Sequence, residues 1–337
     1  MTATKKIVSE EKLSADQNPI VRKSGLLSRP APWILMSGGL LAYMFFSQRY
    51  QIELNVISKI GSGDTQTVEK AVEINPSVST LPVANSQTFQ TDVLPEAGIK
   101  LPIKWGDLGK QMIGSGVIDA DKFRSLFGGQ LPDDQEAMLT GNWDQPVIIN
   151  QQNSRFLLDL FWALGLGNKN SILTEGEMAN EQYGGAGNFA STGGWSLAKG
   201  QAMDHYSMHS FVSLKSEQQA LVDEVSKNIY RPCCGNSTHF PDCNHGMAML
   251  GLLELMAAQG ATEQQMYDAA LAVNSYWFPQ TYLDLATYFN EQGQAWNQVD
   301  AKLALGQQYS SGQGYAATRK NIKSLPQGQS GGGGCGV

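Results

Sequence analysis

Apolar stretches with helical periodicity dominate the chain from about residue 94 onward. Residues 156–166 are apolar on nearly every side, which predicts a buried central helix. Residues 245–258 have apolar faces formed by methionine and leucine, and they predict a second long helix. A short β-like run is present at residues 147–149. This pattern predicts a mainly α-helical domain.

Capping residues and prolines indicate where the other helices begin. Residues 216–219 and 262–265 have the form of capping boxes, with Ser216 and Thr262 as the cap residues. Pro279 suits the first position of the helix that follows the second box. Further helices are predicted at residues 106–113, 120–127 and 295–305.

Three segments show neither a helical nor a strand period. Residues 58–91 are rich in Ser, Thr, Gln, Gly, Val and Pro, which is typical of a flexible stalk. Residues 175–200 are rich in Gly, Ser and Asn, and predict a long loop whose glycines lack the spacing of a phosphate-binding loop. Residues 311–337 end in a Ser-, Gln- and Gly-rich run, and predict a disordered tail.

An uncharged stretch near the start of the chain predicts a membrane anchor. It covers residues 31–48, close to the ~20 residues that cross a bilayer as a helix. Residues 1–30, with six Lys or Arg against three Asp or Glu, predict a cytoplasmic amino terminus. A cleaved signal peptide is disfavoured because the stretch ends in the bulky residues 44–46, and a core helix is disfavoured because no face is polar.

These boundaries predict one folded domain outside the cell membrane. The expected order is a cytoplasmic basic tail at 1–30, a transmembrane anchor at 31–48, a linker or stalk at 49–93, an α-helical domain at 94–310 and a disordered tail at 311–337. The predicted location is therefore a single-pass protein of the cell membrane with an extracytoplasmic carboxyl-terminal domain.

The charge balance restricts the partners. The chain has 24 Lys and Arg against 31 Asp and Glu, a net charge of −7, and no basic footprint of a nucleic-acid binder. The excess of acidic residues falls after residue 48, so the domain is not expected to lie on anionic lipid. The expected partner is the membrane, through the anchor, and an envelope protein partner stays unidentified.

Cysteine and histidine residues are few, but they cluster. The chain has four of each, and seven of these eight residues lie between His205 and His245. Thiolate and imidazole ligands suit zinc, copper or iron. The cluster therefore predicts a metal site.

The predicted ligands are Cys233, Cys234, Cys243 and His245. Cys243 and His245 stand at the opening of a predicted helix, where the partial positive charge favours a thiolate. Three cysteines and one histidine form a known tetrahedral zinc set. Zinc or copper is expected, and iron less so.

Two further residues are possible ligands, and two histidines are interpreted as packing residues. His239 lies within the cysteine loop, and Met247 follows His245 closely enough to serve as a copper ligand. His205 and His209 are interpreted as sharing one helix face with no ligand between them.

Other interpretations of the cysteines stay open. A disulfide could join Cys243 to Cys233 or Cys234, with Cys335 pairing the remaining thiol, so the protein could be a thiol–disulfide redox protein. It could also be an envelope interaction protein in which the cysteines only staple a loop. Catalysis by a Cys243 nucleophile lacks an identifiable orienting group, so the sequence favours no enzymatic activity.

Residues 230–290 resemble bacterial extracytoplasmic proteins named for a Pro-Cys-Tyr-Cys-Gly-Cys motif. Residues 232–235 match the motif with the tyrosine deleted, and Asn236 replaces its last cysteine. The family's later cysteine before an apolar helix resembles Cys243, and its following turn resembles residues 260–265. These proteins are suspected metal binders of unestablished function, so the resemblance implies a location outside the cell and metal handling.

Overall fold

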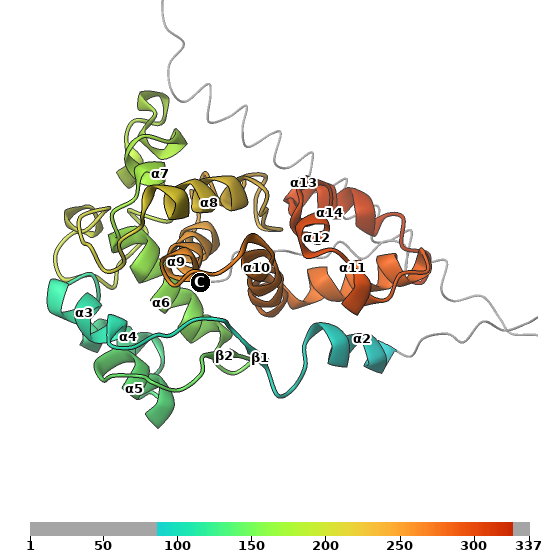
Figure 1. Cartoon of the computed structure of the whole chain (residues 1–337), viewed down its shortest axis with the longest axis horizontal. Helices are drawn as coiled ribbons and strands as arrows, with labels where there is room; N and C mark the ends of the chain where they lie inside the picture. Colours follow the sequence, from blue (N-terminus) through green and yellow to red (C-terminus); the bar gives the residue numbers. More distant parts are fainter. Residues whose placement is uncertain (1–85, 326–337) are drawn as a thin grey trace, which may run out of the picture. The chain divides into compact units, whose positions relative to one another are not determined.

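A computed structural model describes residues 86–325 of the chain, and this part is mainly helical, as the sequence predicted (Figure 1). The predicted cytoplasmic tail and membrane anchor, most of the predicted stalk, and Cys335 lie outside the described residues. Among the helices that are described, none combines the length and the apolar character needed to cross a bilayer.

Two long helices form the centre of the domain. They are α6 (Ser154–Gly167) and α9 (Asn244–Ala258), and both are buried over nearly their whole length, which confirms the predicted central helices. Glycines let the two backbones touch: a Cβ atom on Gly165 would lie 2.1 Å from the carbonyl oxygen of Met247. A Cβ atom on Gly251 would lie 2.4 Å from the carbonyl oxygen of Phe161.

The remaining helices surround this pair (Figure 1). Their bounds are α2 (Ser86–Val93), α3 (Leu108–Ser115), α4 (Ala120–Leu126), α5 (Asp133–Thr140), α7 (Ser171–Thr174), α8 (Ser216–Lys227), α10 (Glu263–Trp277), α11 (Pro279–Glu291), α12 (Ala301–Leu305), α13 (Gln307–Ser310) and α14 (Gly312–Arg319). Helix α3 packs on α6, α8 packs on α9, and α10 packs on both; α11 and α12 pack on α10, and α2 and α14 pack on α11.

Sheet structure in the described residues is confined to one short antiparallel pair. Strand β1 (Ile99–Lys100) pairs with β2 (Ile148–Ile149), with Ile99 opposite Ile149. The β-like run predicted at 147–149 is therefore a strand.

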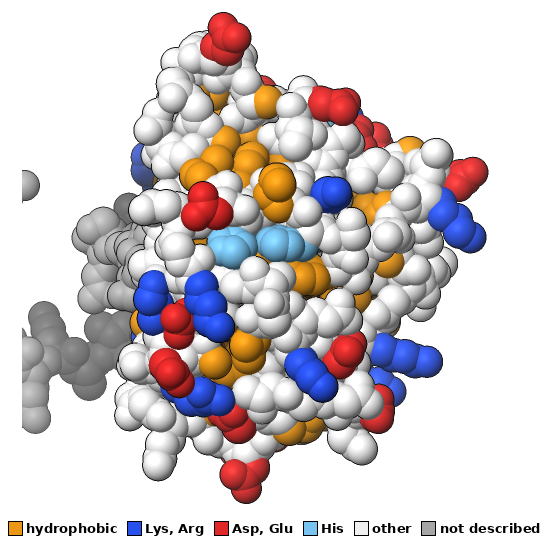
Figure 2. Space-filling model, turned by 90° about the vertical axis from the view of Figure 1, so that its left-hand side faces the viewer, with side chains coloured by type: hydrophobic (Ala, Val, Ile, Leu, Met, Phe, Trp, Pro, Cys, Tyr) orange, Lys and Arg blue, Asp and Glu red, His pale blue; other side chains and the backbone are white. Residues whose placement is uncertain are grey.

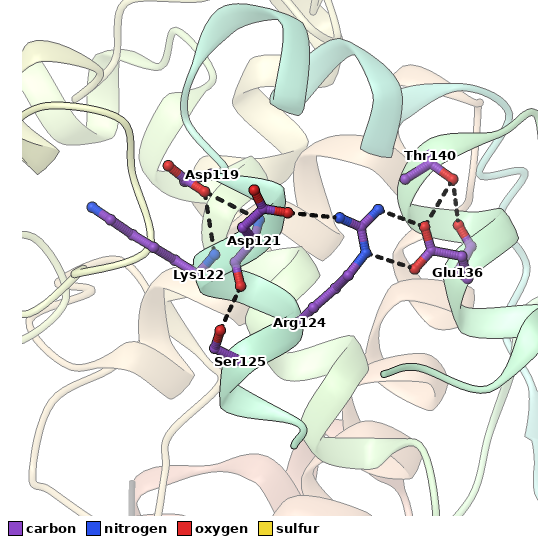
Figure 3. Close-up of polar contacts among 7 residues, drawn as sticks. All are labelled: Asp119, Asp121, Lys122, Arg124, Ser125, Glu136 and Thr140. Atoms are coloured by element: carbon purple, nitrogen blue, oxygen red, sulfur yellow. Dashed lines mark hydrogen bonds and ion pairs between the residues drawn. The ribbon is translucent and has the colours of Figure 1, made fainter. Parts of the chain in front are cut away.

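Local capping fixes α4, and an ion pair joins it to α5 (Figure 3). The carboxylate of Asp119 accepts hydrogen bonds from the backbone N–H groups of Asp121 (3.1 Å) and Lys122 (3.2 Å), as its position in the sequence predicted. Arg124 donates two hydrogen bonds to Glu136, at 2.7 and 3.0 Å, from the first helix to the second. The sequence pattern did not indicate α5.

Two predicted helix starts have different outcomes. The capping box at Thr262 is confirmed, because the Thr262 and Gln265 side chains exchange hydrogen bonds with each other's backbone N–H groups. The prediction of Ser216 as a cap residue is wrong: Ser216 is already helical, and Lys215 is the cap residue, whose N–H donates to the Gln218 side chain at 2.8 Å.

Two predicted segments differ from the structure in their helices. The predicted helix at 295–305 is broken into η5 (Trp296–Gln298) and α12, because Asp300 caps the second piece with a 2.7 Å bond from the Leu303 N–H. The predicted loop at 175–200 holds three short 3₁₀ turns, η1 (Glu177–Ala179), η2 (Glu181–Tyr183) and η3 (Ala186–Asn188).

The predicted ends of the domain are also wrong, because helices continue beyond them. At the start, α2 lies within the segment assigned to the stalk and packs on α11. At the end, α14 lies within the segment assigned to the tail. Asp284, which is buried, accepts hydrogen bonds from Tyr315 (2.7 Å) and Arg319 (2.8 Å) and so fixes α14.

Candidate metal centre

The cysteine loop, residues 228–243, connects α8 to α9 and folds back on itself. A bridge between Tyr230 and Ser237 and a 2.8 Å bond from the Thr238 N–H to the Ile229 carbonyl close the loop. Cys243 is the residue that caps the start of α9. This fold brings the first two cysteines of the loop next to the third.

Donor atoms converge at this point. One ligand atom each from Cys233, Cys243 and His245 lie within 4.8 Å of one another, and the same holds for Cys234, Asp242 and Cys243. The two groups share Cys243, so the four predicted ligands come together and can hold a metal ion. The arrangement does not indicate which metal.

The sulfur spacing fits a tetrahedral ion. The Sγ atoms of Cys233 and Cys243 are 3.7 Å apart. Two sulfurs bound at about 2.3 Å to a tetrahedral zinc ion would be about 3.8 Å apart. The three thiols of the loop are free in the structure, and a disulfide bond would require this pair to approach to about 2.05 Å.

His245 contributes a buried imidazole to the site. Its side chain is 7% exposed, and its Nδ1 atom is buried without a hydrogen-bond partner. The ring packs against Phe278, at 4.5 Å between centroids, and Trp277, at 5.6 Å. A buried nitrogen held in place but unpaired is expected of a residue that binds something the protein itself does not supply.

Arg231 is a component of the site that the sequence interpretation missed. Its guanidinium is fully buried and donates to the Asp242 carboxylate (2.9 Å) and to the Cys243 sulfur (3.2 Å). Gly246 makes room for it, since a Cβ atom there would lie 2.6 Å from the guanidinium carbon. An arginine beside a proline and two cysteines is a sequence signal, but its burial depends on how the loop folds.

The electrostatic environment favours the thiolate form of Cys243. Hydrogen bonds from Cys233 and Cys234, followed by the charge of Arg231, hold the pKa of Cys243 well below its usual value in spite of burial. Hydrogen bonds to the other two thiols, together with burial, raise the pKa of Cys233. Burial also raises the pKa of Asp242. Because metal ligands must lose their protons, Cys243 is the thiol best prepared to bind first.

Two other predicted ligands, His239 and Met247, are not among the converging donor atoms. The Nε2 atom of His239 is 2.7 Å from the Asp223 carboxylate on α8, and His239 belongs to neither group of converging donor atoms. Met247 is fully buried in the hydrophobic core, in the first turn of α9.

His205 and His209 also lie apart from this centre. Their ring nitrogens Nδ1 and Nε2 are 3.1 Å apart, so the two side chains meet, as interpreted from the sequence. They do not share a helix face, however, because a turn after η4 (Ala202–Asp204) brings them together.

No protein-family model matches the chain, and comparison with curated proteins and with solved structures likewise finds no match. The resemblance of residues 230–290 to proteins with the Pro-Cys-Tyr-Cys-Gly-Cys motif therefore stays a prediction.

Proposed function

We propose that this protein binds a soft or borderline metal ion through Cys233, Cys234, Cys243 and His245. The observation that carries the proposal is the convergence of these donors around Cys243, together with the buried, unpaired Nδ1 atom of His245. Thiolate and imidazole donors favour zinc or copper over hard cations such as magnesium and calcium.

The charge of Arg231 supports a thiolate-rich metal centre. Three thiolates and a neutral imidazole around a divalent ion carry a net charge of −1. The buried guanidinium would offset this charge, and its hydrogen bond to the Cys243 sulfur would orient that ligand. A neutral disulfide in the same position would leave Arg231 paired with Asp242 alone.

We further propose that the helical domain lies outside the cell membrane, on the anchor predicted at residues 31–48. The support is the uncharged stretch and its basic flank. A metal site on such a domain would serve in metal handling, or would stabilise the fold.

Elemental analysis of the purified full-length chain, prepared under reducing and metal-replete conditions, tests the metal site. We expect about one equivalent of zinc or copper, in a four-ligand site. Cys243→Ser should lose it, whereas the matched variant Cys335→Ser should retain it because Cys335 is not among the four proposed ligands. A substoichiometric metal content in the unaltered chain would contradict the proposal. The absorption spectrum identifies the metal, because zinc is colourless and copper thiolates and iron–sulfur centres are not.

A second candidate function is thiol–disulfide exchange. The 3.7 Å separation of the Cys233 and Cys243 sulfurs and the lowered pKa of Cys243 favour it. Thiol counting separates the two functions. Chelation alone should release titratable thiols from a metal site, whereas a disulfide yields them only after a reductant is added.

A further inference from the structure

His205 and His209 form a pair of nitrogen donors outside the cysteine loop. The Nδ1 atom of His205 and the Nε2 atom of His209 are 3.1 Å apart, and the two rings are stacked. Two nitrogens bound at about 2.05 Å would be about 2.9 Å apart at neighbouring corners of a square-planar ion, and about 3.3 Å apart on a tetrahedral ion. The observed spacing lies between these values, so both nitrogens can reach one ion once the rings turn their lone pairs from each other toward it.

The backbone fixes the orientation of His205. Its Nε2 atom is 2.8 Å from the carbonyl oxygen of Lys199. A carbonyl only accepts hydrogen bonds, so Nε2 carries the proton and the lone pair of Nδ1 points toward His209. Histidines that bind metals are held in the same way, with the second ring nitrogen donating to a carbonyl or carboxylate.

A strained turn holds the two rings together. Ser207, between them, has a φ of 54°, and it is the only non-glycine residue among those described with a positive φ. Its N–H donates to the Leu166 carbonyl, and the His209 N–H donates to the Gly167 carbonyl, both at 2.8 Å. Backbone in this region costs about 1–3 kcal/mol for a residue other than glycine, and such strain is concentrated at functional sites. The end of α6 therefore keeps the turn, and the two donors, in place.

His209 is partly exposed, whereas His205 is buried, with 8% of its surface exposed. Figure 2 shows two neighbouring histidine side chains on the surface, bordered by apolar side chains. Met203 and Met208, in the same segment, are 39% and 58% exposed. Burial, followed by electrostatic interaction with His205 and Lys169, lowers the pKa of His209. Only the neutral form can bind a metal.

We propose that His205 and His209 are the ligands of a second metal site, reached from the side of His209, which binds a divalent ion of the imidazole-preferring class such as copper or nickel. The ion takes Nδ1 of His205 and Nε2 of His209. The proton on Nε2 of His209 transfers through water to Nδ1 of the same ring, so the ring stays neutral and no proton is lost overall. Water fills the other coordination positions.

Titration of the full-length chain with Ni²⁺ tests this site, because Ni²⁺ binds imidazole and does not oxidise thiols. We expect His209→Asn to bind one equivalent less than the unaltered chain, or to bind that equivalent about tenfold or more weakly. The matched control is His239→Asn. His239 is also hydrogen-bonded, to Asp223, but has no second imidazole beside it, so this variant should retain the full stoichiometry.

A spectroscopic measurement makes the result independent of the cysteine loop. Electron paramagnetic resonance of a chain in which all four cysteines are replaced by serine, with one equivalent of Cu²⁺, should show coupling to two imidazole nitrogens, and His205→Asn in that background should reduce it to one. Equal Ni²⁺ stoichiometry and equal affinity in all three chains, or an unchanged nitrogen coupling after His205→Asn, would overturn the second site. Neither result depends on whether the Cys243 site binds metal. If the chain without cysteines fails to fold, the Ni²⁺ titrations decide alone.

Discussion

The two ends of helix α9 bury polar groups in different ways. Near its carboxyl end, Glu254 is fully buried, and both of its carboxyl oxygens accept hydrogen bonds, from Asn168 (3.0 Å) and Asn170 (2.5 Å). These amides are themselves paired, since the Asn168 oxygen accepts from the Val212 N–H and the Asn170 oxygen from the Ile172 N–H. The carboxyl oxygens and the amide groups of this network all have partners.

At the amino end of α9, polar groups are buried without a full set of partners. The Nη1 atom of Arg231 and the Nδ1 atom of His245 have no hydrogen-bond partner, although both are buried. An unpaired buried polar atom costs about 1–3 kcal/mol. The network at Glu254 is closed, whereas at Cys243 the imidazole nitrogen of His245 is left for an ion. The difference between the two ends is that this unpaired atom lies beside three thiols.

The largest loss of stability should come from a substitution at the amino end of α9. We expect Arg231→Ala to lower the free energy of unfolding by about 3–5 kcal/mol, because it leaves the Cys243 and Asp242 side chains without their buried cation. Denaturant unfolding monitored by circular dichroism measures this change. The control Arg155→Ala removes an exposed arginine near the Phe127 ring and should cost about 1 kcal/mol or less. Equal losses in the two variants would show that the buried guanidinium of Arg231 stabilises the fold no more than an exposed arginine does.

At the carboxyl end of α9, the pH dependence of the free energy of unfolding should reveal the buried carboxyl group of Glu254. Burial raises the pKa of Glu254 to about 8 from an ordinary value of 4.5. The folded protein therefore keeps a proton that the unfolded chain releases, and this contribution to stability is present below pH 4.5 and lost as the pH rises through 8.

Glu254→Gln tests this titration. At low pH the variant should be less stable by about 1–3 kcal/mol, because its amide N–H₂ group faces amide donors where an oxygen accepted hydrogen bonds. The deficit should shrink toward pH 9, since the glutamine cannot ionise. Burial also raises the pKa of Asp159, to about 7. Asp159 is present in both proteins, so its titration changes both free energies of unfolding equally. A deficit that stays constant between pH 5 and pH 9 would contradict the raised pKa.

The smallest effect should come from the ion pair between α4 and α5, where solvent screens the charges. Arg124→Ala should cost about 1 kcal/mol or less, and the cost should decrease at high salt. Lys302→Ala, which removes a more exposed pair with Glu263, should cost still less. Thermal unfolding at low and high salt measures both variants. An Arg124→Ala cost that is the same at low and high salt would contradict a screened ion pair.

Local sequence signals predicted a large part of the fold. The apolar runs of α6 and α9 and the caps at Asp119 and Thr262 depend on neighbouring residues, and all four are confirmed. Helix α14 could not be predicted in the same way. Its sequence is rich in glycine and polar residues, and its contacts with the buried Asp284 join positions 31 and 35 residues apart.

The candidate site was predictable in its ligands but not in its surroundings. Residue type and spacing indicated Cys233, Cys234, Cys243 and His245, which the fold brings together. The burial of Arg231 depends on the path of the loop and on the absence of a side chain at Gly246. The geometry of His205 and His209 depends on the left-handed backbone of Ser207, and no helical spacing rule anticipates such a residue.

The backbone contact between α6 and α9 has a consequence for the exchange of an ion. Cys243 and His245 belong to the opening turn of a helix that the glycine contacts fix against its partner, whereas Cys233 and Cys234 belong to a loop. An ion at this centre would therefore be released stepwise, with the loop thiols dissociating first and the helix ligands last. An incoming acceptor would compete for the ion from the loop side, and the rate of transfer would follow the opening of the loop rather than the unfolding of the domain.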